Sequence, residues 1–160
     1  MLATATPLQI RPVPREDWPA AFSCGEVFFA ERKLPGRFSL ARSLEVWGLA
    51  AAAFPHVIIG VYADAQIVGG MGVLIVQDDW SDHRFAPETF WFLRPEYRCS
   101  TAALRCLREA EQWIRAAAVR DFRVAAFHGE DFDSLSAIYQ RLGFVPWRTE
   151  FRKELSDGGH

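Results

Sequence analysis

The fold of this chain is decided by one stretch, which reads ETFWFLRPEYRCSTAAL from Glu88 to Leu104 and continues as a helical pattern to Ala118. Residues Thr89–Leu93 are β-branched, aromatic or apolar, which predicts a buried strand. Pro95 ends this strand, because proline lacks the N–H that a strand ladder needs. A strand, a loop of small residues and a helix start therefore follow one another. Such a helix start offers unpaired N–H groups and a positive dipole end, so it is either a phosphate site or a plain helix start.

The segment after this loop predicts an amphipathic helix followed by a strand. Apolar residues recur at a spacing of three to four, at positions Ala103, Leu107, Ala110, Ile114 and Ala117. An apolar run then predicts a strand at Phe122–Phe127. A strand, a crossover helix and a strand of this length form a right-handed unit with parallel strands.

The other segments predict a mixed α/β domain. We expect a helix between Asp17 and Lys33, interrupted at Gly25, and a second helix to Ala53, capped by Ser39, with Leu44, Trp47, Leu49 and Ala52 facing inward. Between this helix and the central strand we expect a hairpin and then an exposed loop at 78–87. The remaining expected elements are a first strand at 8–13, hairpin strands at 57–62 and 67–76, a helix at 134–142 ended by Gly143, and final strands at 144–147 and 149–155.

Bulk properties limit the classes of function. Residues 1–155 are expected to form a single domain, followed by a polar tail at 156–160. The formal net charge of −2 provides no overall attraction to nucleic acid or to an anionic membrane. The longest apolar run, 47–62, is interrupted by Pro55, His56 and Gly60, so we expect no membrane span. The start of the chain lacks the features of a signal peptide, and the 3 cysteines form no disulfide or zinc pattern, so we expect a cytoplasmic protein.

Two motifs resemble the signatures of the GNAT N-acetyltransferase superfamily. The stretch from Leu93 to Leu104 resembles V-x-P-x-Y-R-G-x-G-x-G/A, and its matching residues are Pro95, Tyr97, Arg98 and Ala103. Cys99 and Thr101 stand where that signature has glycine. The stretch Ala137–Phe144 resembles the second signature of the family, A-x-Y-x-x-x-G-F. The order of expected elements also matches, and some details resemble small members encoded by phages and prophages.

The resemblance implies an α/β (α+β) fold of the GNAT type. Its central sheet would be mixed and mostly antiparallel, with helices on its flanks and one splayed pair of parallel strands. In this chain the splayed pair would be Thr89–Leu93 and Phe122–Phe127.

The resemblance also implies an acyl-CoA-dependent N-acyltransferase, which would transfer acetyl from acetyl-CoA to a primary amine by direct attack. The backbone of Leu93 would bind the pantetheine of coenzyme A. The pyrophosphate would be held by the loop residues Arg98, Cys99, Ser100, Thr101, Ala102 and Ala103. We expect no metal, because no group of His, Cys and carboxylates has metal-ligand spacing.

Two residues are the candidates for the proton transfers. Tyr139 matches the tyrosine that protonates the departing thiolate in the family; the alternative is a core tyrosine on a short helix. Glu88 is placed like a glutamate that acts as a base through water; the alternative is an exposed carboxylate at a strand edge. His128 is a second candidate base, because an imidazole has a suitable pKa.

The acceptor is expected to be an amine on a small molecule or a protein, with no membrane partner and no nucleic acid, and a homodimer stays open. Glu26 and Glu31 are expected near the acceptor pocket, where carboxylates could bind a cationic amine or simply form a solvated helix face. The rival interpretation is a catalytically inactive GNAT-fold protein that binds or inhibits. It is favoured by Cys99 and Thr101, and by Asp131–Asp133 where the family often has asparagine.

Overall fold

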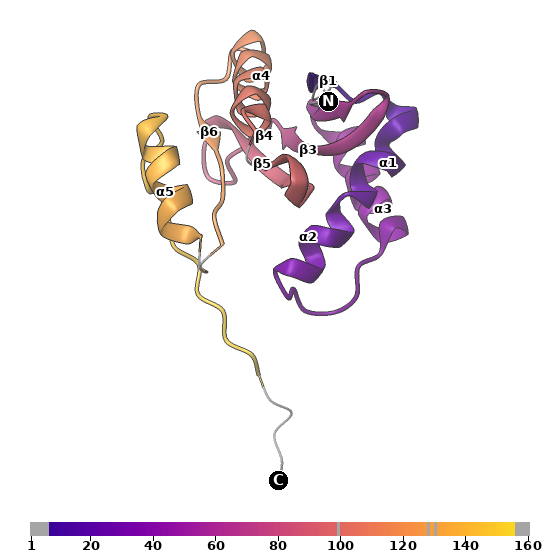
Figure 1. The fold of residues 1–160 in the computed structure, drawn as a ribbon. Coiled ribbons are helices and arrows are strands. Elements are labelled where there is room, and N and C mark those ends of the chain that lie inside the picture. Colours follow the sequence, from indigo (N-terminus) through magenta and orange to yellow (C-terminus); the bar gives the residue numbers. More distant parts are fainter. Residues whose placement is uncertain (1–6, 99, 128, 130, 156–160) are drawn as a thin grey trace. The chain divides into compact units, whose positions relative to one another are not determined.

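The computed structural model describes residues 7–98, 100–127, 129 and 131–155. The chain divides into two compact units, Met1–Val124 and Ala125–His160, and each is described by itself (Figure 1). The expectation of one domain over residues 1–155 stays a prediction. None of the described helices is long and apolar enough to cross a membrane.

The first unit is built around a 6-stranded mixed sheet. The strands run in the order β1-β2-β3-β5-β4 with antiparallel neighbours, and β6 pairs with β5 in parallel, as the sequence predicted. Its elements are β1 (Gln9–Pro12), η1 (Arg15–Asp17), α1 (Trp18–Ser23), α2 (Gly25–Glu31), α3 (Leu40–Ala53), β2 (His56–Ala63), β3 (Gln66–Leu74), β4 (Val76–Gln77), β5 (Arg84–Leu93), η2 (Pro95–Tyr97), α4 (Ala102–Ala116) and β6 (Phe122–Arg123).

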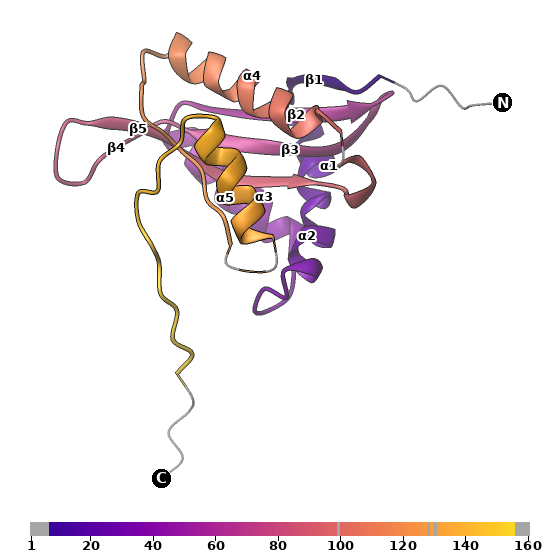
Figure 2. The same cartoon turned by 60° about the vertical axis from the view of Figure 1, so that its left-hand side comes forward.

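Helices α1, α2 and α3 cover one face of this sheet, and α4 covers the other (Figure 2). On the first face the rings of Trp18 and Trp47 pack edge to face, with centroids 6.1 Å apart. Ser39 caps α3 as predicted, because its hydroxyl accepts a hydrogen bond from the N–H of Arg42. The predictions that Leu49 and Ala52 face inward are wrong, since both are exposed, Leu49 to 67%. Trp47 is buried, and residues two apart on a helix point to nearly opposite sides.

Helix α4 packs through the apolar stripe that the sequence predicted. Its buried residues are Ala102, Cys106, Leu107, Ala110 and Ile114. The thiol of Cys106 points to the carbonyl oxygen of Ile59 on β2, at 3.6 Å. Burial raises the pKa of this thiol to about 12, so it stays protonated and belongs to the core. On the exposed side, Arg105 donates a hydrogen bond to the carbonyl of Leu8 at 2.9 Å.

The central strand is longer than predicted. Residues 84–87 were expected in a loop, but β5 begins at Arg84, because Arg84 and Phe85 pair with Gln77 and Val76 of β4. Pro87 favoured the loop interpretation. Proline is nevertheless tolerated in a strand at a position that does not have to donate to the ladder.

The following strand is shorter than predicted. β6 covers only Phe122–Arg123 of the expected 122–127. In the second unit, α5 (Phe132–Arg141) forms as expected and ends before Gly143, whose φ of 90° suits glycine. The predicted strands at 144–147 and 149–155 are wrong, since none of these residues is in a strand. Apolar, aromatic and β-branched residues favour a strand locally, but a strand also needs a hydrogen-bonded neighbour.

Candidate functional site

The candidate site begins at an irregularity in β5. Val73 of β3 pairs with Glu88, but the preceding Gly72 pairs with Phe90, so Thr89 is an extra residue that forms a β-bulge. The hydroxyl of Thr89 donates to the carbonyl of Gly72 at 3.0 Å. A Cβ on Gly72 would lie 2.3 Å from the Phe90 ring, so glycine permits this close approach.

The bulge coincides with the end of the parallel pairing between β5 and β6. The last paired residues are Pro87 and Arg123, and β6 ends there while β5 continues to Leu93. The parallel pairing therefore involves only residues near the start of β5. This is the arrangement expected for a splayed pair, and it confirms the predicted fold class.

The loop after β5 uses several of its own amides. The N–H groups of Arg98 and Ser100 donate to the carbonyls of Pro95 and Tyr97, both at 3.2 Å. The N–H of Ala102 donates to the hydroxyl of Ser100, also at 3.2 Å. These three N–H groups donate within the loop. Fewer backbone N–H groups of residues 98–103 are therefore left for a phosphate than the sequence analysis predicted.

The start of α4 still has backbone N–H groups that its own helix does not use. The first hydrogen bond of this helix turn runs from the N–H of Arg105 to the carbonyl of Thr101, at 3.0 Å. Ala103 and Leu104 therefore lie in the first turn, where the helix provides no acceptor for their N–H groups. Thr101 is exposed and its side chain makes no capping hydrogen bond. Phosphate oxygens fit this turn, because backbone N–H groups and the helix dipole both favour negative charge. Cys99 lies outside the described residues.

Arg98 connects the loop to two other elements. Its Nε donates to the carbonyl of Leu93 at 2.7 Å, and its Nη2 lies 2.6 Å from a carboxylate oxygen of Glu31. Leu93 was predicted to contact pantetheine and Arg98 to contact pyrophosphate. In this structure the Arg98 side chain instead bonds the Leu93 carbonyl. Its guanidinium also forms an ion pair with Glu31 at the end of α2.

A cluster that the sequence analysis missed lies at the other end of β5. The imidazole Nε2 of His83 lies 2.8 Å from the Asp121 carboxylate, and Arg123 donates to the same carboxylate at 2.8 Å. The guanidinium of Arg123 also lies over the ring of Phe85, 3.6 Å from its centroid. The hydrogen bond from Arg123, supported by that from His83, lowers the pKa of Asp121. His83 and Asp121 are 38 positions apart, so only the pairing of β5 with β6 brings them together.

Glu88 and Tyr139 belong to different units. Glu88 is half-buried in β5 directly before the bulge. In the second unit, Tyr139 is 7% exposed and its hydroxyl donates to the carbonyl of Ala125 at 3.4 Å. Its ring centroid lies 5.6 Å from that of Phe144. Tyr139 is thus a buried tyrosine with a positioned hydroxyl, and its role as an acid stays a prediction. His128 lies outside the described residues.

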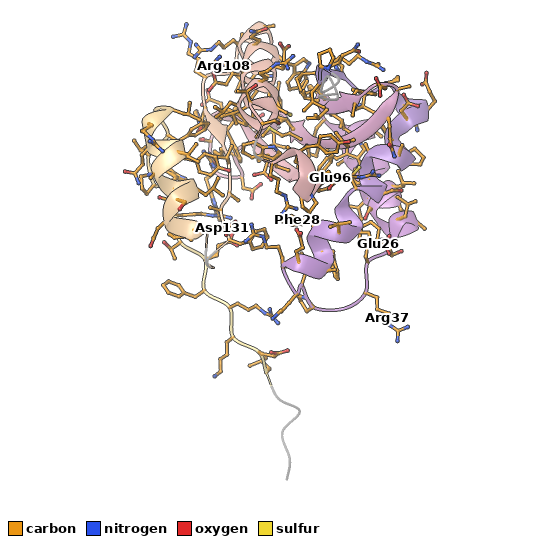
Figure 3. All side chains as sticks on the ribbon, in the orientation of Figure 1. Glu26, Phe28, Arg37, Glu96, Arg108 and Asp131 are labelled. Carbon is orange, nitrogen blue, oxygen red and sulfur yellow. The ribbon has the colours of Figure 1, made fainter. Side chains whose placement is uncertain are left out.

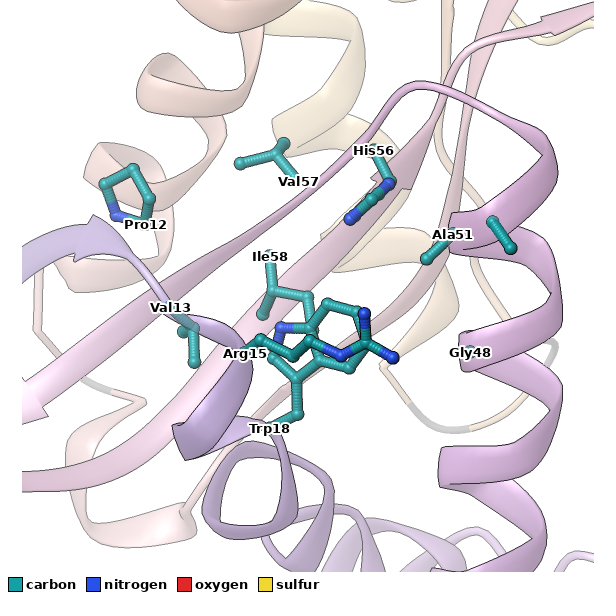
Figure 4. A pocket seen from close by; sticks show the side chains of 10 residues that line it. Pro12, Val13, Arg15, Trp18, Gly48, Ala51, His56, Val57 and Ile58 are labelled. Carbon is teal, nitrogen blue, oxygen red and sulfur yellow. The ribbon is translucent and has the colours of Figure 1, made fainter.

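A cavity of about 350 Å³ lies elsewhere in the first unit, between β1, β2, α1 and α3 (Figure 4). Arg15, Trp18 and His56 line its polar and aromatic side, and the guanidinium of Arg15 lies over the Trp18 ring at 5.4 Å. None of the predicted site residues lines it. In the described part of the chain, no group of three His, Cys, Asp or Glu side chains could hold a metal ion.

Solved structures with the same fold are acetyltransferases by description. A predicted acetyltransferase with acetyl-CoA from Clostridium acetobutylicum has a TM-score of 0.76 at 12% identity, covering 96% of this chain and 100% of its own. A putative acetyl transferase from Pyrococcus furiosus has a TM-score of 0.74 at 12% identity, covering 93% and 100%. An aminoglycoside acetyltransferase from an uncultured soil metagenomic sample has a TM-score of 0.70 at 13% identity, covering 93% and 97%. At these identities the likeness shows the fold.

The sequence comparisons give a match to a family model but none to a curated protein. A sequence model of the Acetyltransferase (GNAT) family matches residues 16–144, a range that includes the central strand, the loop and both signature motifs. Together with the β5 bulge and the short parallel pair, this match shows that the chain belongs to the GNAT acetyltransferase family.

Proposed function

We propose that this protein is an acyl-CoA-dependent N-acyltransferase that transfers acetyl from acetyl-CoA to a primary amine. The observation that carries this proposal is the path of β5. The strand bulges at Thr89 where its parallel partner ends, and then leads through a short loop into the exposed start of α4. An edge of β5 beside a helix start suits a ligand with an extended amide-containing arm and a phosphate end.

Three parts of the chain would hold the cosubstrate. The carbonyl of Leu93 is the acceptor for an amide of the extended arm. The N–H groups of Ala103 and Leu104 are the donors for phosphate oxygens, with Arg98 as the nearby cation. The other predicted loop residues, Cys99, Ser100, Thr101 and Ala102, would shape the loop and keep it small. The solved relative from Clostridium acetobutylicum, described with acetyl-CoA, supports this choice of cosubstrate.

The chemistry is a direct acyl transfer. Acetyl-CoA would supply the acetyl group as a thioester, so a C–N bond forms with the amine while the C–S bond breaks. Glu88, beside the bulge, would accept the amine proton through a water molecule. Tyr139 would give its proton to the leaving thiolate, a role that suits a phenol because its pKa near 10 keeps it protonated until the thiolate forms.

The acceptor is proposed only as a class, a cationic primary amine on a small molecule or a protein. Carboxylates on α2, at Glu26 and Glu31, would attract such a cation. Two of the similar solved structures are described as an aminoglycoside acetyltransferase, which supports an amine but does not extend to the identity of this acceptor. Cys24 and Cys106 are free buried thiols, which fits the expected cytoplasm, and the phage-like character is a further expectation from sequence details.

The proposal is tested by thermal unfolding with acetyl-CoA, with CoA and with ADP as a nucleotide control. Ligand at about 100 times its Kd should stabilise the protein by about 2.7 kcal/mol, which raises Tm by a few degrees. Acetyl-CoA and CoA should raise Tm more than ADP. An acceptor screen that detects the free CoA thiol then tests transfer. If millimolar acetyl-CoA leaves Tm unchanged, the cosubstrate assignment is wrong.

The second candidate is a GNAT-fold protein that binds or inhibits without catalysis. One observation favours it: the amides of Arg98, Ser100 and Ala102 are used within the protein. An exchange of Thr101 for glycine tests the loop. It should strengthen CoA binding if the side chain crowds the phosphate, and weaken CoA binding if the hydroxyl donates to the phosphate. No effect would mean that the loop does not bind phosphate, which favours the second candidate.

A further inference from the structure

We infer that Glu31 is a positioning residue that competes with the phosphates of coenzyme A for Arg98, and that it thereby lowers the affinity for the cosubstrate. This inference rests on the proposed function, since it names a residue that regulates the same binding loop. The residue is supplied by α2, a different element from the strand and loop that form the site.

Arg98 is held at two points. Its Nε donates to the carbonyl of Leu93, and its Nη2 bonds the carboxylate of Glu31, at 2.7 and 2.6 Å. The first contact covers the carbonyl that we propose for the extended arm of the cosubstrate. The second neutralises the guanidinium of Arg98, the cation that we propose for the phosphates. Cosubstrate binding at this site therefore requires Arg98 to leave at least one of these partners.

The position of Glu31 is unfavourable for its own helix. Glu31 is the last residue of α2, where the helix dipole is negative, and α2 has no basic residue in its last turn. A carboxylate there is stabilised if a cation from another element approaches, and Arg98 is that cation. The interaction therefore depends on the tertiary structure and holds α2 to the loop.

Helix α2 is also fixed at its beginning, which limits how far Glu31 can move. A Cβ on Gly25 would lie 3.0 Å from the ring of Phe92, so the helix start lies directly against β5. The ring of Phe28 lies 6.3 Å from that of Phe92. With α2 packed on the strand, the carboxylate of Glu31 stays within reach of the loop after Arg98 is released.

The pair is exposed enough to be exchangeable. The side chains of Arg98 and Glu31 are 41% and 37% exposed, so solvent screens their attraction. A phosphate group at the start of α4 offers the same guanidinium more negative charge, and the helix dipole stabilises that phosphate. We therefore expect a phosphate group to displace the Glu31 carboxylate from Arg98. Breaking this ion pair costs free energy, which lowers the affinity for the cosubstrate.

The test is the affinity of CoA for the Glu31→Gln variant, measured by isothermal titration calorimetry at low salt. Glutamine keeps the size of the side chain and removes its charge, so Arg98 is released more easily. We expect Kd for CoA to fall about threefold, the scale of one partly exposed ion pair. The gain should shrink at high salt, because salt screens the pair in the parent protein.

Matched controls separate this pair from the general effect of removing a negative charge. Glu26→Gln changes an exposed carboxylate on the same helix, and Glu96→Gln changes one in η2, two positions from Arg98 (Figure 3). Both should alter Kd by less than Glu31→Gln does. In an Arg98→Gln background, Glu31→Gln should no longer strengthen CoA binding, because the competition needs the arginine.

A second readout does not need catalysis. The Nε–H of Arg98 should give a protected arginine signal in NMR spectra of the free protein, because it donates to Leu93. CoA should shift this signal, and Glu31→Gln should weaken its protection.

The outcomes separate the inference from the proposed function. If CoA binds the parent protein and Glu31→Gln equally well, the inference is wrong and the proposed function stands. If Glu26→Gln or Glu96→Gln strengthens binding as much, the effect is general electrostatics and the inference is also wrong. If CoA binds none of the variants, including the parent, the proposed function fails and the inference fails with it.

Discussion

The two ends of β5 are each held by an arginine–carboxylate pair, but the pairs differ in what they connect. At the start of the strand, Asp121, directly before β6, bonds Arg123 of β6, and His83 adds a second hydrogen bond. At its end, Arg98 in the loop bonds Glu31 of α2 through one oxygen. The first cluster lies beside a hydrogen-bonded strand pair, whereas the second joins a loop to a helix end. The same chemistry therefore lies beside strand pairing at one end and ties a loop to a helix at the other, where we propose that it controls cosubstrate binding.

The largest expected effect is catalytic and belongs to Glu88, in the middle of β5 directly before the bulge. Glu88→Gln should lower kcat about 100-fold with the Kd for CoA nearly unchanged, because it removes a base but leaves the phosphate site intact. Arg98→Gln, in the loop after the end of β5, should change Kd more than kcat. Steady-state kinetics and calorimetry on both variants measure this division. Equal changes in kcat and Kd for the two variants would show that the bulge and the loop do not have separate roles.

The next effect concerns the packing of β5 on β3 near the loop. A Cβ on Gly69 would lie 2.5 Å from the carbonyl oxygen of Phe92 and 2.7 Å from the Cα of Leu93. Gly69→Ala should therefore lower the free energy of unfolding by about 2 kcal/mol, since backbone must move. Gly48→Ala is the matched control, because nothing lies within 4 Å of its Cβ. It should stabilise α3 by about 0.5 kcal/mol. Urea unfolding of both variants measures the difference, and a stable Gly69→Ala protein would contradict the close strand contact.

The smallest effect is pH-dependent and tests the cluster at the start of β5. The pKa of Asp121 is lowered on folding, so its charged form adds stability above the ordinary value of 3.8. This stability is lost as the pH falls through the lower pKa of the folded state. Asp121→Asn should be less stable than the parent by about 1 kcal/mol at neutral pH, and the difference should disappear in acid. Thermal unfolding from neutral to acid pH measures it, and a difference that grows on acidification would refute the assignment.

Much of the fold could be predicted because its signals are local. Ser39 caps α3 through its own hydroxyl, Gly143 supplies the positive φ after α5, and Leu107, Ala110 and Ile114 of the predicted stripe on α4 are buried. Each of these depends on neighbours within a few positions. The errors lie where a partner strand decides: β4 extends β5 to Arg84, and residues 144–147 and 149–155 do not form the predicted strands.

The candidate site could also be predicted from the sequence only in part. The motif around Arg98 and the small residues at the start of α4 are readable from the sequence, and they led to the family that the comparisons show. The bulge at Thr89 was not readable, because a bulge is a mismatch between two strands and the register of β3 is needed to see it.

The sequence by itself determined the order of the elements up to β6, the signature motifs and the membership in an acetyltransferase family. These follow from local periodicity, caps and motif residues, which each short segment carries alone. Only the tertiary structure decided that Arg98 meets Glu31, that His83 meets Asp121, and that β5 bulges beside the end of β6. These contacts join residues from separate elements, and their geometry arises only when helices and strands pack into one sheet with defined register.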